Sequence, residues 1–166
     1  QQAGIATTVI NHKEFANRDA FDVAMQHAID VWRPDVVVLA GFMRILTPAF
    51  VQHFAGKLVN IHPSLLPVYK GLHTHKRVLA SGDKKHGCSV HFVNQELDGG
   101  AVIAQAVFDV LPQDNEQTLT ERVHNYEHLL YPQVLSWFAN GRLCYQAGQP
   151  MLDSQVLSCP VRLLFQ

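Results

Sequence analysis

Hydrophobic positions along the chain form short continuous runs that alternate with stretches of helical spacing. Runs rich in apolar and β-branched residues predict strands at 5–10, 35–40, 57–61, 88–93 and 101–110. Apolar residues three and four positions apart predict helices at about 17–32, 47–54, 73–80 and 118–137. Strands that alternate with helices indicate an α/β domain with a largely parallel sheet. The run at 35–40 is apolar on both faces, which favours a central strand of that sheet.

Individual residues set the expected limits of the helices. Asn17 and Thr47 are predicted N-caps, because their side-chain oxygens can accept backbone N–H groups at a helix start. Thr118 and Glu121 have the spacing of a capping box for the last long helix. Pro132 is expected to kink or divide that helix, because proline has no backbone N–H to donate.

The two ends of the chain are less regular than its middle. Gly4 is predicted to stop a helix that comes before it, so a segment upstream of residue 1 is expected. After Gly141, which ends the last helix, the pattern is weak and favours a hairpin or a frayed end. We therefore assign residues 1–143 to one domain and residues 144–166 to a C-terminal tail.

Composition narrows the class of protein. A chain of 166 residues with 48% hydrophobic and 16% charged residues suits one folded domain. The net charge of −1 offers no basic surface for a nucleic acid. No apolar run reaches the roughly 20 residues of a membrane span. Three widely spaced cysteines without a Cys-x-x-Cys pair indicate reduced thiols and hence a cytoplasmic protein.

Polar residues at the ends of predicted strands are the candidates for chemistry. Asn60 and His62 close a buried run, and residues two apart on an extended chain point the same way. An amide and an imidazole side by side can both donate to one developing oxyanion, and histidine can exchange a proton near neutral pH. Asp98, before Gly99 and Gly100, is the carboxylate best placed to orient the imidazole and hold its charge.

These residues are expected to meet because ligands gather beyond the carboxyl ends of the strands in such sheets. The segments 41–44 and 94–100 and the Asn60–His62 pair all follow predicted strands, so they are placed at one rim. A purely structural role stays open for each of them. Asn60 and His62 would also suit the backbone of a loop, and Asp98 before two glycines would also suit an ordinary turn.

A metal site is the less favoured use of the histidines. The conceivable zinc ligands are His62, His73, His75 and His86. The chain has no His-Glu-x-x-His motif, and on a helix His73 and His75 would point apart. We therefore expect no metal. His91 alternates along a strand and is predicted to be a core or supporting residue.

Five segments of the sequence together resemble a known family. They read PDVVVLAGFMRIL, VNIHPSLLP, GLHTH, HGCSVHFVNQELDGGAVIAQ and EHLLYPQVLSWFANGRL, and the resemblance extends to about Leu143. The Asn-x-His-Pro-Ser-Leu-Leu-Pro and Leu-Asp-Gly-Gly motifs are similar to those of the folate-dependent formyltransferases. Gly-Leu-His-Thr-His and Glu-His-x-x-Tyr-Pro favour the phosphoribosylglycinamide formyltransferases over methionyl-tRNA formyltransferase and formyltetrahydrofolate deformylase.

The resemblance implies a Rossmann-like formyltransferase fold and an enzyme of purine biosynthesis, in which 10-formyltetrahydrofolate gives its formyl group to glycinamide ribonucleotide. It implies that Asn60, His62 and Asp98 are catalytic and that no metal takes part. The residues implied in folate binding are Arg18, Met43, Arg44, Ile45, Leu46, Asn60, Asn94, Gln95, Glu96, Leu97 and Asp98. Those implied against glycinamide ribonucleotide are Glu127 and His124, although the family pattern leads us to expect glutamine at position 124.

The same resemblance implies small-molecule substrates only, with no nucleic-acid or membrane partner, and a monomer or a homodimer. It also implies that the first strands of the family and its Gly-Asn-Gly-Ser-Asn phosphate loop are missing here. The run at 5–10 would then lack a neighbouring strand, and the run at 35–40 would expose an apolar edge. A chain of these residues alone is expected to be poorly soluble, or to fold only with a partner, and to transfer no detectable formyl group to glycinamide ribonucleotide.

The expected mechanism is direct formyl transfer. Asn60 and protonated His62 donate to the formyl oxygen, while Asp98 holds the charge on His62 and relays the amine proton through a water. Two alternatives stay open at this point. One is a hydrolase of the same family, in which water replaces the amine, and the other is a folate-binding fragment without turnover.

Overall fold

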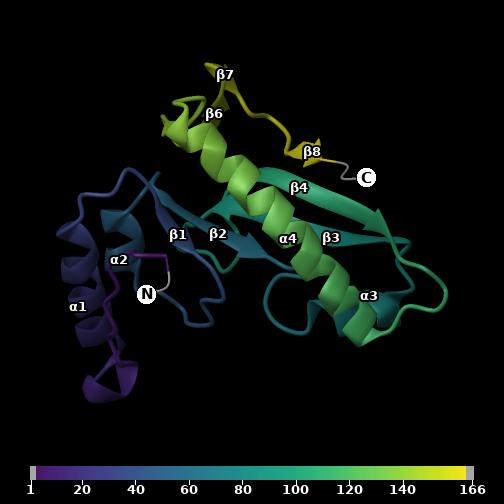
Figure 1. The fold of residues 1–166 in the computed structure, drawn as a ribbon, viewed down its shortest axis with the longest axis horizontal. Helices are drawn as coiled ribbons and strands as arrows, with labels where there is room; N and C mark the ends of the chain where they lie inside the picture. The colour runs from purple at the N-terminus through teal and green to yellow at the C-terminus, as the bar shows by residue number, and fades with distance from the viewer. Residues whose placement is uncertain (1–2, 164–166) are drawn as a thin grey trace.

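The computed structural model describes residues 3–163 as a mixed sheet with helices around it and a small second sheet (Figure 1). The helices are α1 (Arg18–Asp30), α2 (Pro48–His53), α3 (Thr74–Ser81) and α4 (Glu116–Ala139), with a 3-10 turn at His12–Glu14. The strands are β1 (Val37–Leu39), β2 (Leu58–His62), β3 (Lys85–Phe92), β4 (Val102–Asp109), β5 (Leu143–Gln146), β6 (Gln149–Leu152), β7 (Gln155–Val156) and β8 (Val161–Leu163). The four helices predicted at 17–32, 47–54, 73–80 and 118–137 are present, and so is every predicted strand except the one at 5–10.

The main sheet has the strand order β1-β2-β3-β4-β8. β1 is parallel to β2 and β8 is parallel to β4, whereas β3 is antiparallel to both of its neighbours. Four strands therefore share one direction and β3 alone is reversed, which confirms the mostly parallel α/β class. The direction of β3 was not visible in the sequence, since a period of two is the same in either direction.

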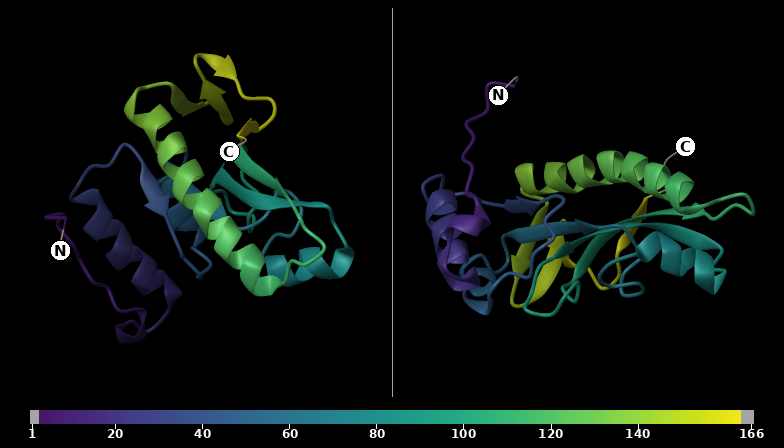
Figure 2. Two further views of the ribbon diagram at one scale, coloured as in Figure 1. Left: turned by 45° about the vertical axis from the view of Figure 1, so that its right-hand side comes forward. Right: turned by 90° about the horizontal axis from the view of Figure 1, so that it is seen from below.

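Helix α4 covers one face of the sheet and forms the main core with β3 and β4 (Figures 1 and 2). Its inward-facing Val123, Leu130 and Val134 are fully buried against Val90 and Ile103 of those strands. Burying a side chain of this size stabilises the fold by about 1.5–3 kcal/mol each. The core therefore lies directly behind the strands that bear the polar candidates.

The start of α4 corrects one prediction. The capping box joins Asn115 and Thr118, each accepting the backbone N–H of the other, and not Thr118 and Glu121. Pro132 lies inside α4, yet the helix continues without division to Ala139. The buried side chains on both sides of Pro132 hold the helix together despite the missing N–H.

Helices α1 and α2 lie together beside the β1 end of the sheet (Figure 1). Both begin at the predicted caps, because Asn17 accepts the N–H of Ala20 and Thr47 accepts that of Phe50. Buried Asp22 of α1 accepts the N–H of Thr47 at 2.7 Å, which fixes the start of α2 against α1. This pair of helices positions the segment that follows β1.

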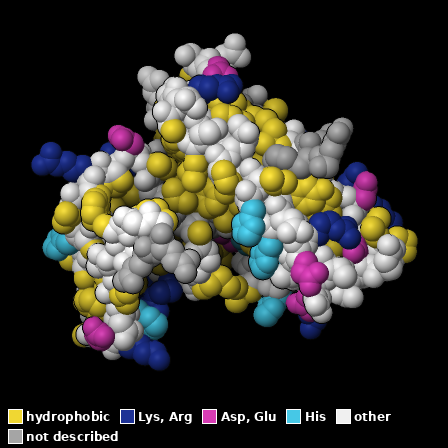
Figure 3. Space-filling model, in the orientation of Figure 1, with side chains coloured by type: hydrophobic (Ala, Val, Ile, Leu, Met, Phe, Trp, Pro, Cys, Tyr) yellow, Lys and Arg dark blue, Asp and Glu magenta, His cyan; other side chains and the backbone are white. Residues whose placement is uncertain are grey.

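The first residues of the described chain are not paired with the sheet. Residues 5–10 form neither helix nor strand, and Ile5 and Val9 are 71% and 92% exposed, so the predicted strand is wrong. β1 is bonded to β2 alone within residues 3–163 and is an edge strand, not a central one. This matches the exposed edge that the family resemblance implied. Figure 3, drawn in the orientation of Figure 1, shows hydrophobic side chains on the face towards the viewer, between the N-terminal segment and α4.

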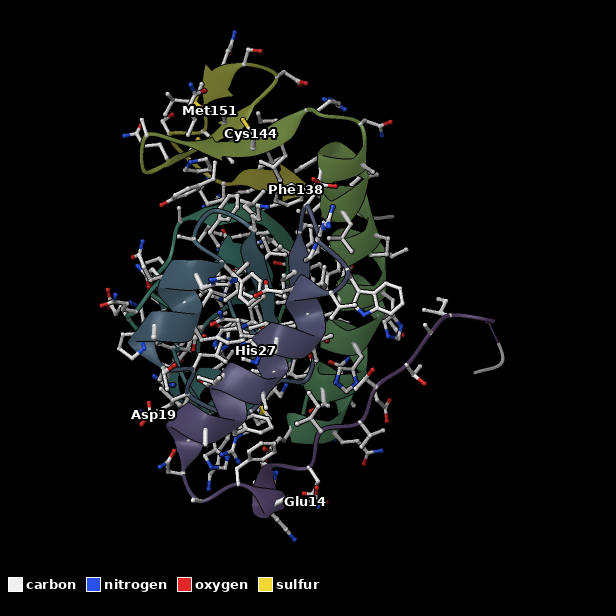
Figure 4. The ribbon with its side chains drawn as sticks, turned by 90° about the vertical axis from the view of Figure 1, so that its left-hand side faces the viewer. Glu14, Asp19, His27, Phe138, Cys144 and Met151 are labelled. Atoms are coloured by element: carbon white, nitrogen blue, oxygen red, sulfur yellow. The ribbon has the colours of Figure 1, made fainter. Side chains whose placement is uncertain are left out.

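The C-terminal part contains a hairpin, as the weak pattern allowed. β5 and β6 pair around Ala147 and Gly148, and Cys144 lies opposite Met151 (Figure 4). β7 extends this small sheet, and β8 returns to the main sheet beside β4. Residues 1–2 and 164–166, at the ends of the two assigned segments, lie outside the described residues. The helix expected before Gly4 falls on residues 1–2 and is therefore not described.

Candidate functional site

The site begins at the end of β2, where Asn60 and His62 lie on one side of the strand. Asn60 is opposite His91 of β3 and His62 is opposite Ser89. Asn60 is half-buried and His62 is only 6% exposed. The i, i+2 geometry expected from the sequence is therefore present, in surroundings that exclude most water.

The His62 ring lies between two acceptors. Nε2 donates to the carbonyl oxygen of Tyr69 at 2.9 Å, and Nδ1 lies 3.4 Å from Oδ2 of Asp98. A carbonyl and a carboxylate can only accept, so a ring with a proton on both nitrogens satisfies both of them. The arrangement therefore suits an imidazolium beside a carboxylate.

Asp98 is held in place by the backbone around it. Its Oδ2 accepts the N–H of Gly71 at 2.8 Å, and its side chain is 10% exposed. Gly100 follows closely behind, where a Cβ would lie 1.8 Å from the carbonyl oxygen of Phe92. Only glycine fits at position 100, so the Gly-Gly step after Asp98 lets the loop close onto the sheet.

His91 orients the Asn60 amide. Its Nδ1 donates to the carbonyl of Phe92 at 2.8 Å, so Nε2 of the neutral ring accepts from Nδ2 of Asn60 at 3.3 Å. Burial lowers the pKa of His91, which keeps this ring neutral and its Nε2 an acceptor. The remaining N–H of the Asn60 amide is then free to point into the cleft in front of the strand.

The route by which Asp98 reaches His62 differs from the expected one. Because β3 is reversed, its carboxyl end lies beside the start of β2, where Val93 donates to the carbonyl of Leu58. The segment 93–100 then folds back along β2 to bring Asp98 to His62. The expectation that these residues meet is confirmed, but they do not meet at the shared carboxyl ends of parallel strands.

A cleft that is partly open to solvent lies in front of Asn60. Its walls come from the segment after β1 and from the loop after β3. The lining residues are Leu39, Phe42, Arg44, Ile45, Leu46, Val51, Asn60, His91, Val93, Asn94, Gln95, Glu96, Leu97 and Asp98. Met43 is 77% exposed and Arg18 is an exposed residue at the start of α1, and neither of them lines this cleft.

His124 and Glu127 lie on α4. Glu127 is half-buried, and this burial raises the pKa of its carboxyl group, partly offset by the charges of His124 and His128. Burial also lowers the pKa of His75; the charge of Glu116 opposes this, and His124 and His62 lower the pKa further.

The remaining histidines do not gather around a common centre. His75 and His86 share a hydrogen bond of 2.9 Å between their rings. Within residues 3–163, no three His, Cys, Asp or Glu side chains are grouped as ligands for a metal ion. None of the helices described is long and apolar enough to cross a membrane.

Comparison with known sequences identifies the kind of protein that has this site. A sequence profile described as formyl transferase matches residues 1–135. The chain belongs to the formyl transferase family. Phosphoribosylglycinamide formyltransferase of Escherichia coli (strain K12) is 57% identical over 157 residues, which are 95% of this chain and 74% of that protein.

Two further relatives, one human and one bacterial, are similar to this chain over most of its length. The human trifunctional purine biosynthetic protein adenosine-3 is 44% identical over 87% of this chain, a region that makes up 15% of that protein. The solved structure of phosphoribosylglycinamide formyltransferase from Coxiella burnetii, in complex with CHES, superimposes with a TM-score of 0.91 at 50% identity. That superposition covers 96% of this chain and 77% of the other.

Sequence reasoning missed two residues of this formyl transferase site. Tyr69 contacts His62 and Gly71 contacts Asp98, each through a backbone group. Every residue type offers a backbone carbonyl and nearly every type an N–H, so no residue pattern marks such a contact. The non-glycine, left-handed conformation of Tyr69 was equally invisible in the sequence.

Proposed function

We propose that this formyl transferase moves the formyl group of 10-formyltetrahydrofolate to the primary amine of glycinamide ribonucleotide, a step of purine biosynthesis. The observation that supports it most is the position of His62, held between Tyr69 and Asp98 and two residues from Asn60. The E. coli relative that is 57% identical over 157 residues is named for that activity, phosphoribosylglycinamide formyltransferase.

The cleft suits a folate co-substrate in shape and chemistry. Apolar side chains such as Leu39, Val51 and Val93 offer a wall for a flat ring system. The exposed polar residues 94–96 offer hydrogen-bonding groups at the other wall. The formyl carbon would then lie where the cleft reaches Asn60 and Asp98, with the amine of the second substrate approaching from the side of α4.

The chemical step requires stabilisation of one oxygen and removal of one proton. As the amine attacks the formyl carbon, negative charge develops on the formyl oxygen, and the free N–H of Asn60 donates to it. The 3.4 Å separation between Nδ1 of His62 and Asp98 leaves the Nδ1 proton able to be shared with that oxygen. Asp98 holds the charge on His62 and, through a water, takes the proton that the amine loses. The carbon–nitrogen bond to the folate then breaks, and that nitrogen receives the same proton back from Asp98 through the water, which regenerates the carboxylate.

The test is the substitution Asn60→Ala in the protein expressed from its own gene. Removing an oxyanion donor typically costs about 100- to 1000-fold in kcat. Folate binding, measured by fluorescence quenching, should weaken far less than kcat falls, because many other residues line the cleft. Asn11→Ala is the matched control, because Asn11 is an exposed asparagine bonded to Glu14 away from the cleft. An Asn60→Ala variant with more than about a tenth of the wild-type rate would exclude this oxyanion role.

The two alternatives give different results in the same assay. Rapid release of formate from 10-formyltetrahydrofolate without any amine acceptor would identify a hydrolase. Folate binding without turnover, with or without glycinamide ribonucleotide, would identify a binding protein. Either result would overturn the proposal of formyl transfer.

A further inference from the structure

One loop contacts both members of the His62–Asp98 pair. The loop connects β2 to α3, and its Tyr69 carbonyl accepts the Nε2 proton of His62 at 2.9 Å. Two residues later, the N–H of Gly71 donates to Oδ2 of Asp98 at 2.8 Å. The conformation of residues 69–71 therefore sets the orientation of the imidazole and of the carboxylate together.

The backbone of this loop is in a conformation that needs support. Tyr69 has a φ of +56°, in the left-handed region that a bulky side chain rarely adopts. Holding a non-glycine residue there costs about 1–2 kcal/mol relative to an ordinary conformation, which the surroundings must offset. Its carbonyl faces His62 only because the chain makes this turn.

The Tyr69 side chain supplies the support. Its hydroxyl donates to the carboxylate of Asp83, which lies just after α3. The same hydroxyl lies 2.7 Å from Oγ of Ser81, the last residue of α3. The guanidinium of Arg77 lies 5.2 Å from the centre of the phenol ring and donates to the carbonyl of Lys70 at 2.6 Å. These contacts tie the loop to the far end of α3.

The inner side of the loop is fixed separately. Oγ of Ser89 donates to the carbonyl of Ser64 at 2.6 Å and accepts the N–H of Leu66. Gln105 of β4 donates to the carbonyl of Leu66 at 2.8 Å. Oγ of Ser64 in turn donates to the carbonyl of Val68 at 2.7 Å. These bonds hold residues 64–68 from the side of β3 and β4, and the Tyr69 hydroxyl fixes the next part of the loop from the side of α3.

We propose that Tyr69 is a positioning residue for His62. Its phenol, anchored at Asp83 and Ser81, fixes the carbonyl that binds Nε2 of His62, and this keeps Nδ1 facing Asp98 and the cleft. An imidazole has its two nitrogens on opposite sides of one rigid ring, so fixing Nε2 also fixes Nδ1. The effect on turnover rests on the proposed function, whereas the effect on the His62 ring does not.

The first test is Tyr69→Phe, which removes the hydroxyl and keeps the ring over which Arg77 lies. A misplacement of about 1 Å in a catalytic group can cost about 100-fold, and we expect kcat to fall about 10-fold or more. KM for the folate should change little, because Tyr69 does not line the cleft. A merely structural role would leave kcat of the folded variant unchanged.

Asp83→Asn is the second variant, since it keeps the acceptor oxygen and removes its charge. We expect a smaller fall in kcat than in Tyr69→Phe, and no additional fall when both changes are combined, because the two residues form one contact. Asp153→Asn is the matched control. It removes the same charge from an exposed carboxylate that pairs with Arg142 in the C-terminal hairpin.

The second readout is the ring N–H of His62 in the protein alone, followed by ¹⁵N-edited NMR. Bonding to the Tyr69 carbonyl should protect the Nε2 proton from exchange in the wild type, and Tyr69→Phe should accelerate its exchange. Unchanged exchange together with an unchanged kcat would overturn the positioning role. If the wild-type protein transfers no formyl group but Tyr69→Phe still accelerates exchange of the His62 proton, the proposed function is refuted and the positioning role stands.

Discussion

The buried pair His75–His86 should make the protein sensitive to acid. His86 is 1% exposed, between the ring of Phe108 and that of His75, whose Nδ1 lies 2.9 Å from its Nε2. Burial, and secondly the neighbouring His75, lower the pKa of His86 from the ordinary 6.5 to about 4. The folded protein therefore holds this ring neutral at pH values where the unfolded chain protonates it.

The sign and size of the effect follow from this difference. A histidine with a depressed pKa in the folded state contributes stability above pH 6.5, and this contribution is lost as pH falls towards 4. The full shift corresponds to about 3 kcal/mol, at about 1.36 kcal/mol per pKa unit. Between pH 7 and pH 5 the expected loss from His86 is about 2 kcal/mol.

The substitution His86→Gln removes this titration while keeping a group that can bond to His75. The free energy of unfolding is measured by urea denaturation at pH 7 and at pH 5, for the wild type and the variant. The variant should be less stable at pH 7 because the ring packing is lost. Its further loss on acidification should be smaller than that of the wild type by about 2 kcal/mol.

His27→Gln is the control, since His27 is an exposed residue of α1, the helix nearest the viewer in Figure 4. The other titrating groups are common to the three proteins and cancel in the comparison, so the control should show the acid sensitivity of the wild type. The reasoning is refuted if His86→Gln loses as much stability between pH 7 and pH 5 as the wild type does.

Three further substitutions test other parts of the structure. Tyr131→Phe should lower the free energy of unfolding by about 1–2 kcal/mol, because the buried hydroxyl donates to carbonyls of β1 and β2, and an unchanged urea midpoint would contradict this. Gly87→Ala should destabilise by about 3 kcal/mol or prevent folding, since a Cβ would lie 1.8 Å from the carbonyl oxygen of Ala106, and thermal melting by circular dichroism measures it. Burial raises the pKa of Glu127, so the protonated carboxyl group contributes to the stability of the folded protein, and this contribution is lost as pH rises through the raised pKa. Glu127→Gln should therefore raise stability at pH 7 while it slows transfer to glycinamide ribonucleotide, and equal stability of variant and wild type at pH 7 would count against it.

The sequence contained enough information to predict which strand bears the site. Asn60 and His62 closed an apolar run, and the two-residue period of a strand was sufficient to place them on one side. Asp98 was found by its residue type and its two glycines. The caps at Asn17 and Thr47 were predictable because the chemistry of a cap lies within four residues.

The remaining features depend on partners that are distant in the sequence. Residues 5–10 have the composition of a strand, but a strand also needs a neighbour to bond, and composition does not supply one. β3 runs opposite to the expected direction, because strand direction is set by connections and not by periodicity. The capping box moved to Asn115 because several polar residues in that turn have suitable spacing, and local sequence alone did not separate them.

The folded-back loop between β3 and β4 has a consequence for how the site forms during folding. All three proposed catalytic residues lie within the segment 60–98, and their contacts with Tyr69, Gly71 and His91 join positions 7, 27 and 31 residues apart. β2, β3 and β4 are adjacent in the sheet, so the site needs no strand from either end of the chain. Such a segment tends to open and close as one cooperative unit. In native-state hydrogen exchange, the amides of β2, β3 and β4 should therefore exchange together and last, while those of β1 and residues 5–10 exchange early.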